Sequence, residues 1–97
     1  MSDRPARIRA AIESALKPQR LQLEDESHRH AGHAGAASGR GHFRVAIVST
    51  AFEGLAPLAR HRRVYEALGP LMQTDIHALS IEALTPTEAE RRAPAPR

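Results

Sequence analysis

The chain has 97 residues, enough for one domain with one modest core. Hydrophobic residues make up 41% of the chain and charged residues 26%, proportions typical of a globular protein. The net charge of +3 is too small to indicate nucleic-acid binding unless the charge is concentrated in one place. Cysteine is absent, which excludes disulfides and any thiolate metal site made by this chain alone.

The start of the chain predicts an amphipathic helix over residues 3–17. The apolar stripe recurs at helical spacing and consists of Ile8, Ile12, Ala15 and Leu16. The charged side chains are expected to face away from it: Arg4, Arg7, Arg9 and Glu13. This segment is too charged for a signal peptide, and no apolar run is long enough to span a membrane. We therefore expect a cytoplasmic protein without membrane contacts.

Two strands and a long loop follow. Residues 21–24 alternate as a short strand, and residues 42–49 form the best strand pattern in the chain, with Phe43, Val45 and Ile47 on one face. Residues 27–41 between them are rich in Gly, Ala and His, which predicts a loop. The pair indicates an antiparallel hairpin whose connection is longer than hairpins need, a feature typical of functional or disordered loops.

The second half predicts a helix, a strand and a short helix. Residues 58–72 have a helical stripe, which Gly69-Pro70 should kink or restart because Pro removes a backbone donor. Residues 76–84 predict a strand, with His77 on the same face as Leu79 and Ile81. Thr85-Pro86-Thr87-Glu88 is a capping box that predicts a last helix, and we expect the remaining tail to be disordered.

The predicted order is α-β-β-α-β-α, an α+β fold. A helix joining the second and third strands favours a parallel crossover, and therefore a three-stranded mixed sheet with helices on one face. We assign residues 1–86 to one domain and residues 87–97 to the start of a short helix and a tail.

Histidines are the first candidate for chemistry. Three of them lie close together in the loop at His28, His30 and His33, and His77 opens the last strand. Neutral imidazole binds zinc, copper, nickel or iron, so one rigid and one mobile histidine could form an incomplete metal site that a partner completes. The alternatives are a solvated polar loop and a half-buried histidine satisfied by one hydrogen bond. His42 is interpreted as an ordinary residue at a strand end.

A basic cluster is the second candidate. It lies near the start of the second helix and comprises Arg60, His61, Arg62, Arg63 and, beside them, Tyr65. Such side chains contact phosphates, and Arg also reads guanine edges. The alternative is a solvated helix face. Nucleophile-elbow and phosphate-loop motifs are both absent from the sequence, so we do not expect an enzyme.

Taken together in order and spacing, several of these motifs resemble the BolA family. They are Asp25-Glu26-Ser27 followed by His30, His42-Phe43-Arg44-Val45, Val48-Ser49, Phe52-Glu53-Gly54, Arg60-His61-Arg62-Arg63-Val64-Tyr65 and Ile76-His77-Ala78-Leu79. The resemblance covers the chain from the first helix to about Pro86 and implies a fold similar to a class II KH domain. The GxxG loop through which KH domains bind RNA is not matched, because Gly54-Leu55-Ala56-Pro57 lacks the second glycine.

The resemblance implies two activities. The first is binding to a monothiol glutaredoxin, with a [2Fe–2S] cluster shared between the two proteins and glutathione, as in iron–sulfur cluster assembly or iron sensing. On this sequence the implied ligands are His30 and His77, and His33 is a further candidate in the same loop. The second is transcriptional regulation through duplex DNA contacts near Arg60 to Tyr65, where the modest charge calls for a weak contact unless a homodimer or partner adds to it.

Overall fold

The computed structural model describes residues 4–26 and 41–92. In chain order its elements are α1 (Arg4–Leu16), β1 (Arg20–Asp25), β2 (Gly41–Val48), the 3-10 helix η2 (Thr50–Phe52), α3 (Pro57–Leu68), α4 (Leu71–Thr74), β3 (Ile76–Leu84) and α5 (Pro86–Arg92). Among these described elements, no helix is long and apolar enough to cross a membrane.

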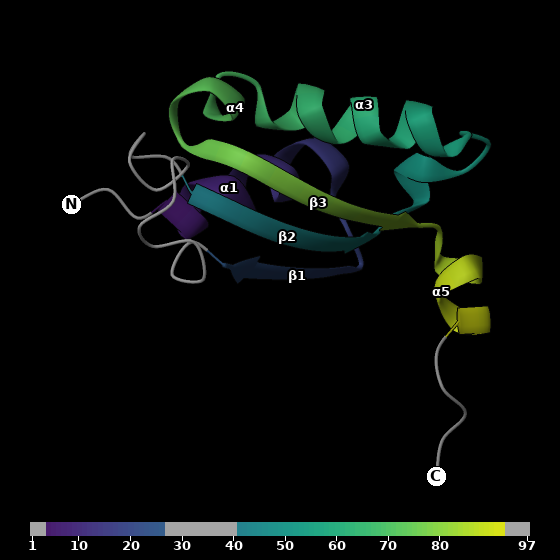
Figure 1. The fold of residues 1–97 in the computed structure, drawn as a ribbon. Coiled ribbons are helices and arrows are strands. Elements are labelled where there is room, and N and C mark those ends of the chain that lie inside the picture. The colour runs from purple at the N-terminus through teal and green to yellow at the C-terminus, as the bar shows by residue number, and fades with distance from the viewer. Residues whose placement is uncertain (1–3, 27–40, 93–97) are drawn as a thin grey trace, which may run out of the picture.

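The sheet has the predicted mixed topology. Its strand order is β1-β2-β3, with β1 antiparallel to β2 and β2 parallel to β3. Helices α1, α3 and α4 lie on one side of this sheet, and α5 projects from its end after β3 (Figure 1). The predicted α+β class with a three-stranded mixed sheet is therefore confirmed, and β2 is the central strand.

The core lies between this sheet and the helices α1 and α3. Strand β2 alternates strictly, so that Phe43, Val45 and Ile47 face the helices while the residues between them face the other way. Ten residues make up the buried cluster: Ile8, Ile12, Leu16, Phe43, Val45, Ile47, Phe52, Val64, Leu68 and Ile76. Ala15, expected in the stripe of α1, is instead exposed.

The break predicted at Gly69-Pro70 is present and separates α3 from α4. Gly69 caps α3 with a positive φ of 54°, and its N–H donates to the carbonyl of Tyr65 at 2.9 Å. That backbone conformation suits glycine because it has no Cβ. The chain therefore turns sharply and enters β3 beside the start of β2.

Phe52 provides a test of this core. It is fully buried although it lies in the short η2 segment between β2 and α3. Phe52→Ala should lower the free energy of unfolding by about 3–5 kcal/mol, because it removes a large apolar side chain and leaves a cavity. Urea denaturation followed by circular dichroism measures the change. Leu58→Ala is the control, since Leu58 is 64% exposed and should shift stability by less than about 0.5 kcal/mol.

Candidate functional site

Two histidines from neighbouring strands lie side by side at the end of the sheet where β2 and β3 both begin. The ring centroids of His42 and His77 are 5.1 Å apart, and the ring planes are tilted by 45°. His77 is exposed and His42 is partly exposed. Along β2, His42 and the buried Phe43 point to opposite faces of the sheet. The two histidines therefore lie on the face that α1 and α3 do not cover.

An irregularity in strand pairing brings His77 to this face. Gly41 pairs with Ile76, but the next residue, His42, pairs with Ala78, so β3 contains one extra residue at this point. As a result Ile76 enters the core at 1% exposure, and His77 does not. The expectation that His77 lies on the same strand face as Leu79 and Ile81 was wrong, because strict alternation does not hold across a bulge.

The pair is an incomplete ligand set. The described residues contain no group of three or more His, Asp or Glu side chains able to hold a metal ion. The predicted loop ligands His30 and His33 lie outside the described residues. Sequence reasoning missed His42 as a neighbour of His77. The predicted topology could have pointed to His42. Two parallel strands that start at the same end of a sheet place their first residues side by side.

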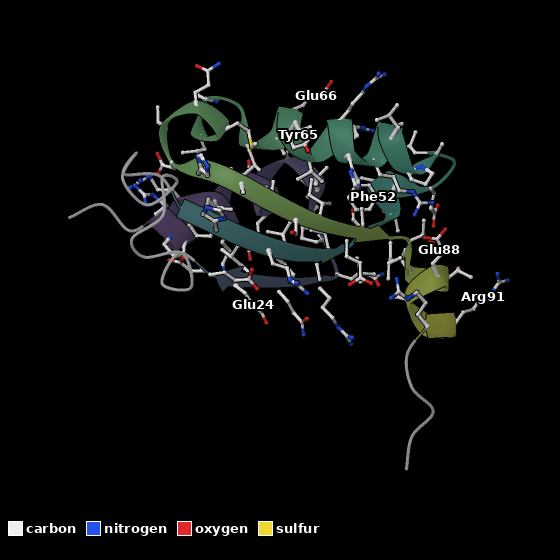
Figure 2. The ribbon with its side chains drawn as sticks, viewed as in Figure 1. Glu24, Phe52, Tyr65, Glu66, Glu88 and Arg91 are labelled. Carbon is white, nitrogen blue, oxygen red and sulfur yellow. The ribbon has the colours of Figure 1, made fainter. Side chains whose placement is uncertain are left out.

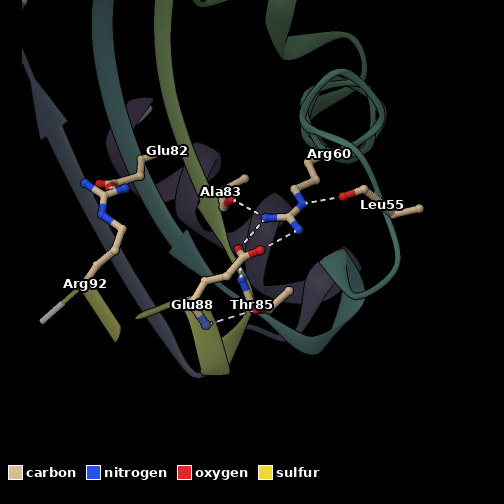
Figure 3. A network of polar contacts seen from close by, with 7 residues as sticks. All are labelled: Leu55, Arg60, Glu82, Ala83, Thr85, Glu88 and Arg92. Atoms are coloured by element: carbon tan, nitrogen blue, oxygen red, sulfur yellow. Dashed lines mark hydrogen bonds and ion pairs between the residues drawn. The ribbon is translucent and has the colours of Figure 1, made fainter. Parts of the chain in front are cut away.

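The basic cluster of α3 divides into two groups. The Arg60 side chain is only 13% exposed, and its Nε donates to the carbonyl of Leu55 at 2.8 Å. Its Nη1 donates to the carbonyl of Ala83 at 3.0 Å. Both Nη atoms also donate to the Glu88 carboxylate, at 2.6 and 2.9 Å (Figure 3). Arg60 therefore joins α3 to β3 and α5 and presents little of its charge to a ligand.

The other members of the cluster face solvent to different degrees. Arg62 and Arg63 are exposed, and His61 is partly buried in a groove of about 380 Å³ at the junction of α3, β3 and α5. Tyr65 is 43% exposed. Figure 2 labels Tyr65 on α3 beside Glu66. This surface, defined by Arg62, Arg63 and Tyr65, is here called the α3 surface.

Two charge clusters lie at opposite ends of β3. At its start, hydrogen bonds from Thr74 and then from Arg7 lower the pKa of Asp75. At its end, the hydrogen bond from Arg60 is the main cause that lowers the pKa of Glu88 to about 2. The same bond raises the pKa of Arg60. Glu88 also completes the predicted capping box: its carboxylate accepts from the Thr85 N–H at 3.0 Å, and the Thr85 hydroxyl accepts from the Glu88 N–H at 3.2 Å.

Comparison with known proteins identifies the family of the chain and supports its fold. The family described as BolA-like protein matches residues 12–88. BolA-like protein 1 of the mouse is 51% identical over 83 residues, which are 86% of this chain and 58% of the mouse protein. The structure of BolA1 from Arabidopsis thaliana superposes with a TM-score of 0.78 at 43% identity, covering 91% of this chain and 97% of that one.

A bacterial relative is named for its function. The DNA-binding transcriptional regulator BolA of Haemophilus influenzae is 36% identical over 81 residues, covering 84% of this chain and 76% of that protein. On the family match and these identities, the chain belongs to the BolA-like family. It spans somewhat more than half the length of the mouse relative.

The Arg60–Glu88 contact predicts a specific acid sensitivity. The folded pKa of Glu88 is about 2, below its ordinary value, so its stabilising contribution is complete above about pH 4.5 and is lost as the pH falls toward 2. Glu88→Gln should lower stability at neutral pH and flatten the stability profile between pH 4.5 and 2. Thermal unfolding at a series of pH values measures both effects.

Glu82→Gln is the matched control for this experiment. Glu82 pairs with Arg92 at 2.6 Å, but both side chains are far more exposed than Arg60, and exposed pairs contribute little. The control should follow the native profile closely. Equal profiles for Glu88→Gln and the native protein would contradict the structural role assigned to Arg60.

Proposed function

We propose that this BolA-like chain supplies imidazole ligands to a [2Fe–2S] cluster that it shares with a monothiol glutaredoxin and glutathione. The single observation that carries the proposal is the His42–His77 pair, whose rings lie 5.1 Å apart on the sheet face that α1 and α3 do not cover. The family membership supports it, and the cluster would serve iron–sulfur assembly or iron sensing.

The residues fit the group. In Rieske-type centres two histidines replace two cysteines on one iron of a [2Fe–2S] cluster, so a chain without cysteine can still hold one iron. The glutaredoxin thiolate and the glutathione thiolate would then hold the other iron. The cluster supplies redox-active, transferable iron when bound. Because imidazole binds metal only in its neutral form, acid should favour release of the cluster.

Within the proposal His77 is the fixed ligand, since it lies on β3. The second ligand is a neighbouring imidazole. The structure favours His42, which already lies against His77, whereas the family resemblance implies His30 in the loop, with His33 close to it in sequence. Both assignments keep His77 on β3 and complete the site with a partner protein.

The test is reconstitution with a cluster-loaded monothiol glutaredoxin, followed by visible absorption and circular dichroism. His77→Ala should abolish the heterocomplex spectrum. Among His42→Ala, His30→Ala and His33→Ala, the variant that changes the spectrum identifies the second ligand. His61→Ala is the control, because His61 lies in the groove beside α5 and should leave the spectrum unchanged. If the native protein gives no heterocomplex, or His77→Ala retains its spectrum, the proposal is wrong.

A second candidate function is DNA binding through the α3 surface. It is favoured by the exposure of Arg62 and Arg63 and by the name of the Haemophilus relative. Arg60 would not contribute directly, because its guanidinium is bound within the domain. A contact built on two arginines is weak and salt-sensitive.

The DNA hypothesis makes a quantitative prediction. Replacing Arg62 and Arg63 by Gln should weaken duplex binding and reduce the slope of log K against log salt by about 1 for each phosphate that is no longer neutralised. Fluorescence anisotropy at several salt concentrations measures the slope. The control removes the same charge elsewhere with Arg9→Gln and Arg20→Gln, in α1 and β1, and should retain most of the native slope. Equal reductions in both variants would show non-specific attraction only.

A further inference from the structure

We infer that Asp75 is a positioning residue for the histidine pair: it fixes the start of β3 so that His77 lies against His42. The inference deepens the proposed function and depends on it for its biological meaning. The contact between the rings can, however, be measured in the metal-free protein. In this arrangement Asp75 acts through the backbone.

The backbone of Asp75 joins three elements. Its N–H donates to the carbonyl of Leu71 at 2.9 Å and so caps α4. Its carbonyl accepts from the N–H of Gly41 at 3.0 Å, which ties it to the first residue of β2. Asp75 therefore fixes the register with which β3 begins to pair with β2.

The carboxylate of Asp75 holds this backbone in place. Its side chain is 8% exposed, and it accepts from the Thr74 hydroxyl at 2.6 Å and from the Arg7 guanidinium. Arg4 Nε lies 3.7 Å from the same carboxylate. Both arginines come from α1, so the charge of Asp75 connects the start of β3 to a separate helix. A buried charge needs such partners, and losing them is costly.

This attachment holds the irregular register on which the histidine pair depends. The extra residue of β3 lies just after Asp75, between the pairs Gly41–Ile76 and His42–Ala78. A slip of one residue would reverse the facing of the first strand residues, turning Ile76 outward and His77 toward the core. Holding Asp75 to α1, α4 and β2 prevents that slip.

The His77 ring lies against the His42 ring, with the centroids 5.1 Å apart. His77 is exposed and is not part of the buried core cluster. The position of His77 therefore comes from the backbone that precedes it. The contacts of Asp75 with Arg4 and Arg7 therefore determine on which face of the sheet the His77 imidazole lies.

The experiment compares the two ends of β3. Asp75→Asn removes the charge at the start of the strand, and Arg7→Gln removes its main partner from α1. Glu88→Gln breaks the charge pair at the other end and is the matched control for general destabilisation. The readout is the nuclear Overhauser contact between the His42 and His77 ring protons in the metal-free protein, recorded well below each variant's unfolding temperature.

Asp75→Asn and Arg7→Gln should lose at least half of the native ring-to-ring intensity, while Glu88→Gln should keep it. Retention by both Asp75→Asn and Arg7→Gln would overturn the inference, as would an equal loss in Glu88→Gln or no ring contact in the native protein. If Asp75→Asn does not fold, Arg7→Gln carries the test alone.

Cluster release provides a second readout that separates this inference from the proposed function. In the glutaredoxin heterocomplex, Asp75→Asn and Arg7→Gln should lose the cluster several-fold faster than the native protein, and Glu88→Gln should not. A native protein that forms no heterocomplex would refute the function, while the ring contacts would still decide the role of Asp75. Native release rates in both variants, together with His77-dependent ligation, would refute only the positioning role.

Discussion

The parallel pairing of β2 with β3 is the constraint on which the candidate site depends. Because both strands begin at the same end of the sheet, their first histidines come together although 35 positions in the sequence separate them. The extra residue of β3 in this pairing then determines on which face of the sheet His77 lies. With the extra residue, Ile76 is buried in the core with Phe43, and His77 lies outside it. Without the extra residue, His77 would enter the core and Ile76 would be exposed on the other face of the sheet.

Polar contacts hold strand β3 at its two ends, in addition to its pairing with β2 and the packing of its apolar side chains. It lies at the edge of the sheet, and only its inward side chains pack against the core. Arg60 donates to the carbonyl of Ala83 on that strand, and Gly41 donates to the carbonyl of Asp75 just before it. An edge strand with few aromatic neighbours gains its fixed position from these polar contacts, which also discourage pairing with other chains.

Most of the fold could be predicted from the sequence because local signals agreed with one another. Alternation in β2, the capping box at Thr85 and the break at Gly69 each indicated a boundary within one or two residues of the observed one. The bulge before Ala78 could not be predicted, since it belongs to the pairing of β2 with β3, which lie far apart in the sequence. The same holds for Arg7 and Arg60, whose partners lie far away in the sequence.

The candidate surfaces lie on opposite sides of the domain, and this bears on how the two functions relate. The histidine pair is on the sheet face that α1 and α3 do not cover, whereas the α3 surface belongs to helix α3 on the other side of the sheet (Figure 1). A protein docked over the histidines would therefore leave Arg62 and Arg63 accessible. Coupling between the sites would have to pass through β3, which touches His42 at one end and Arg60 at the other. The two proposed functions would therefore use different surfaces of the chain.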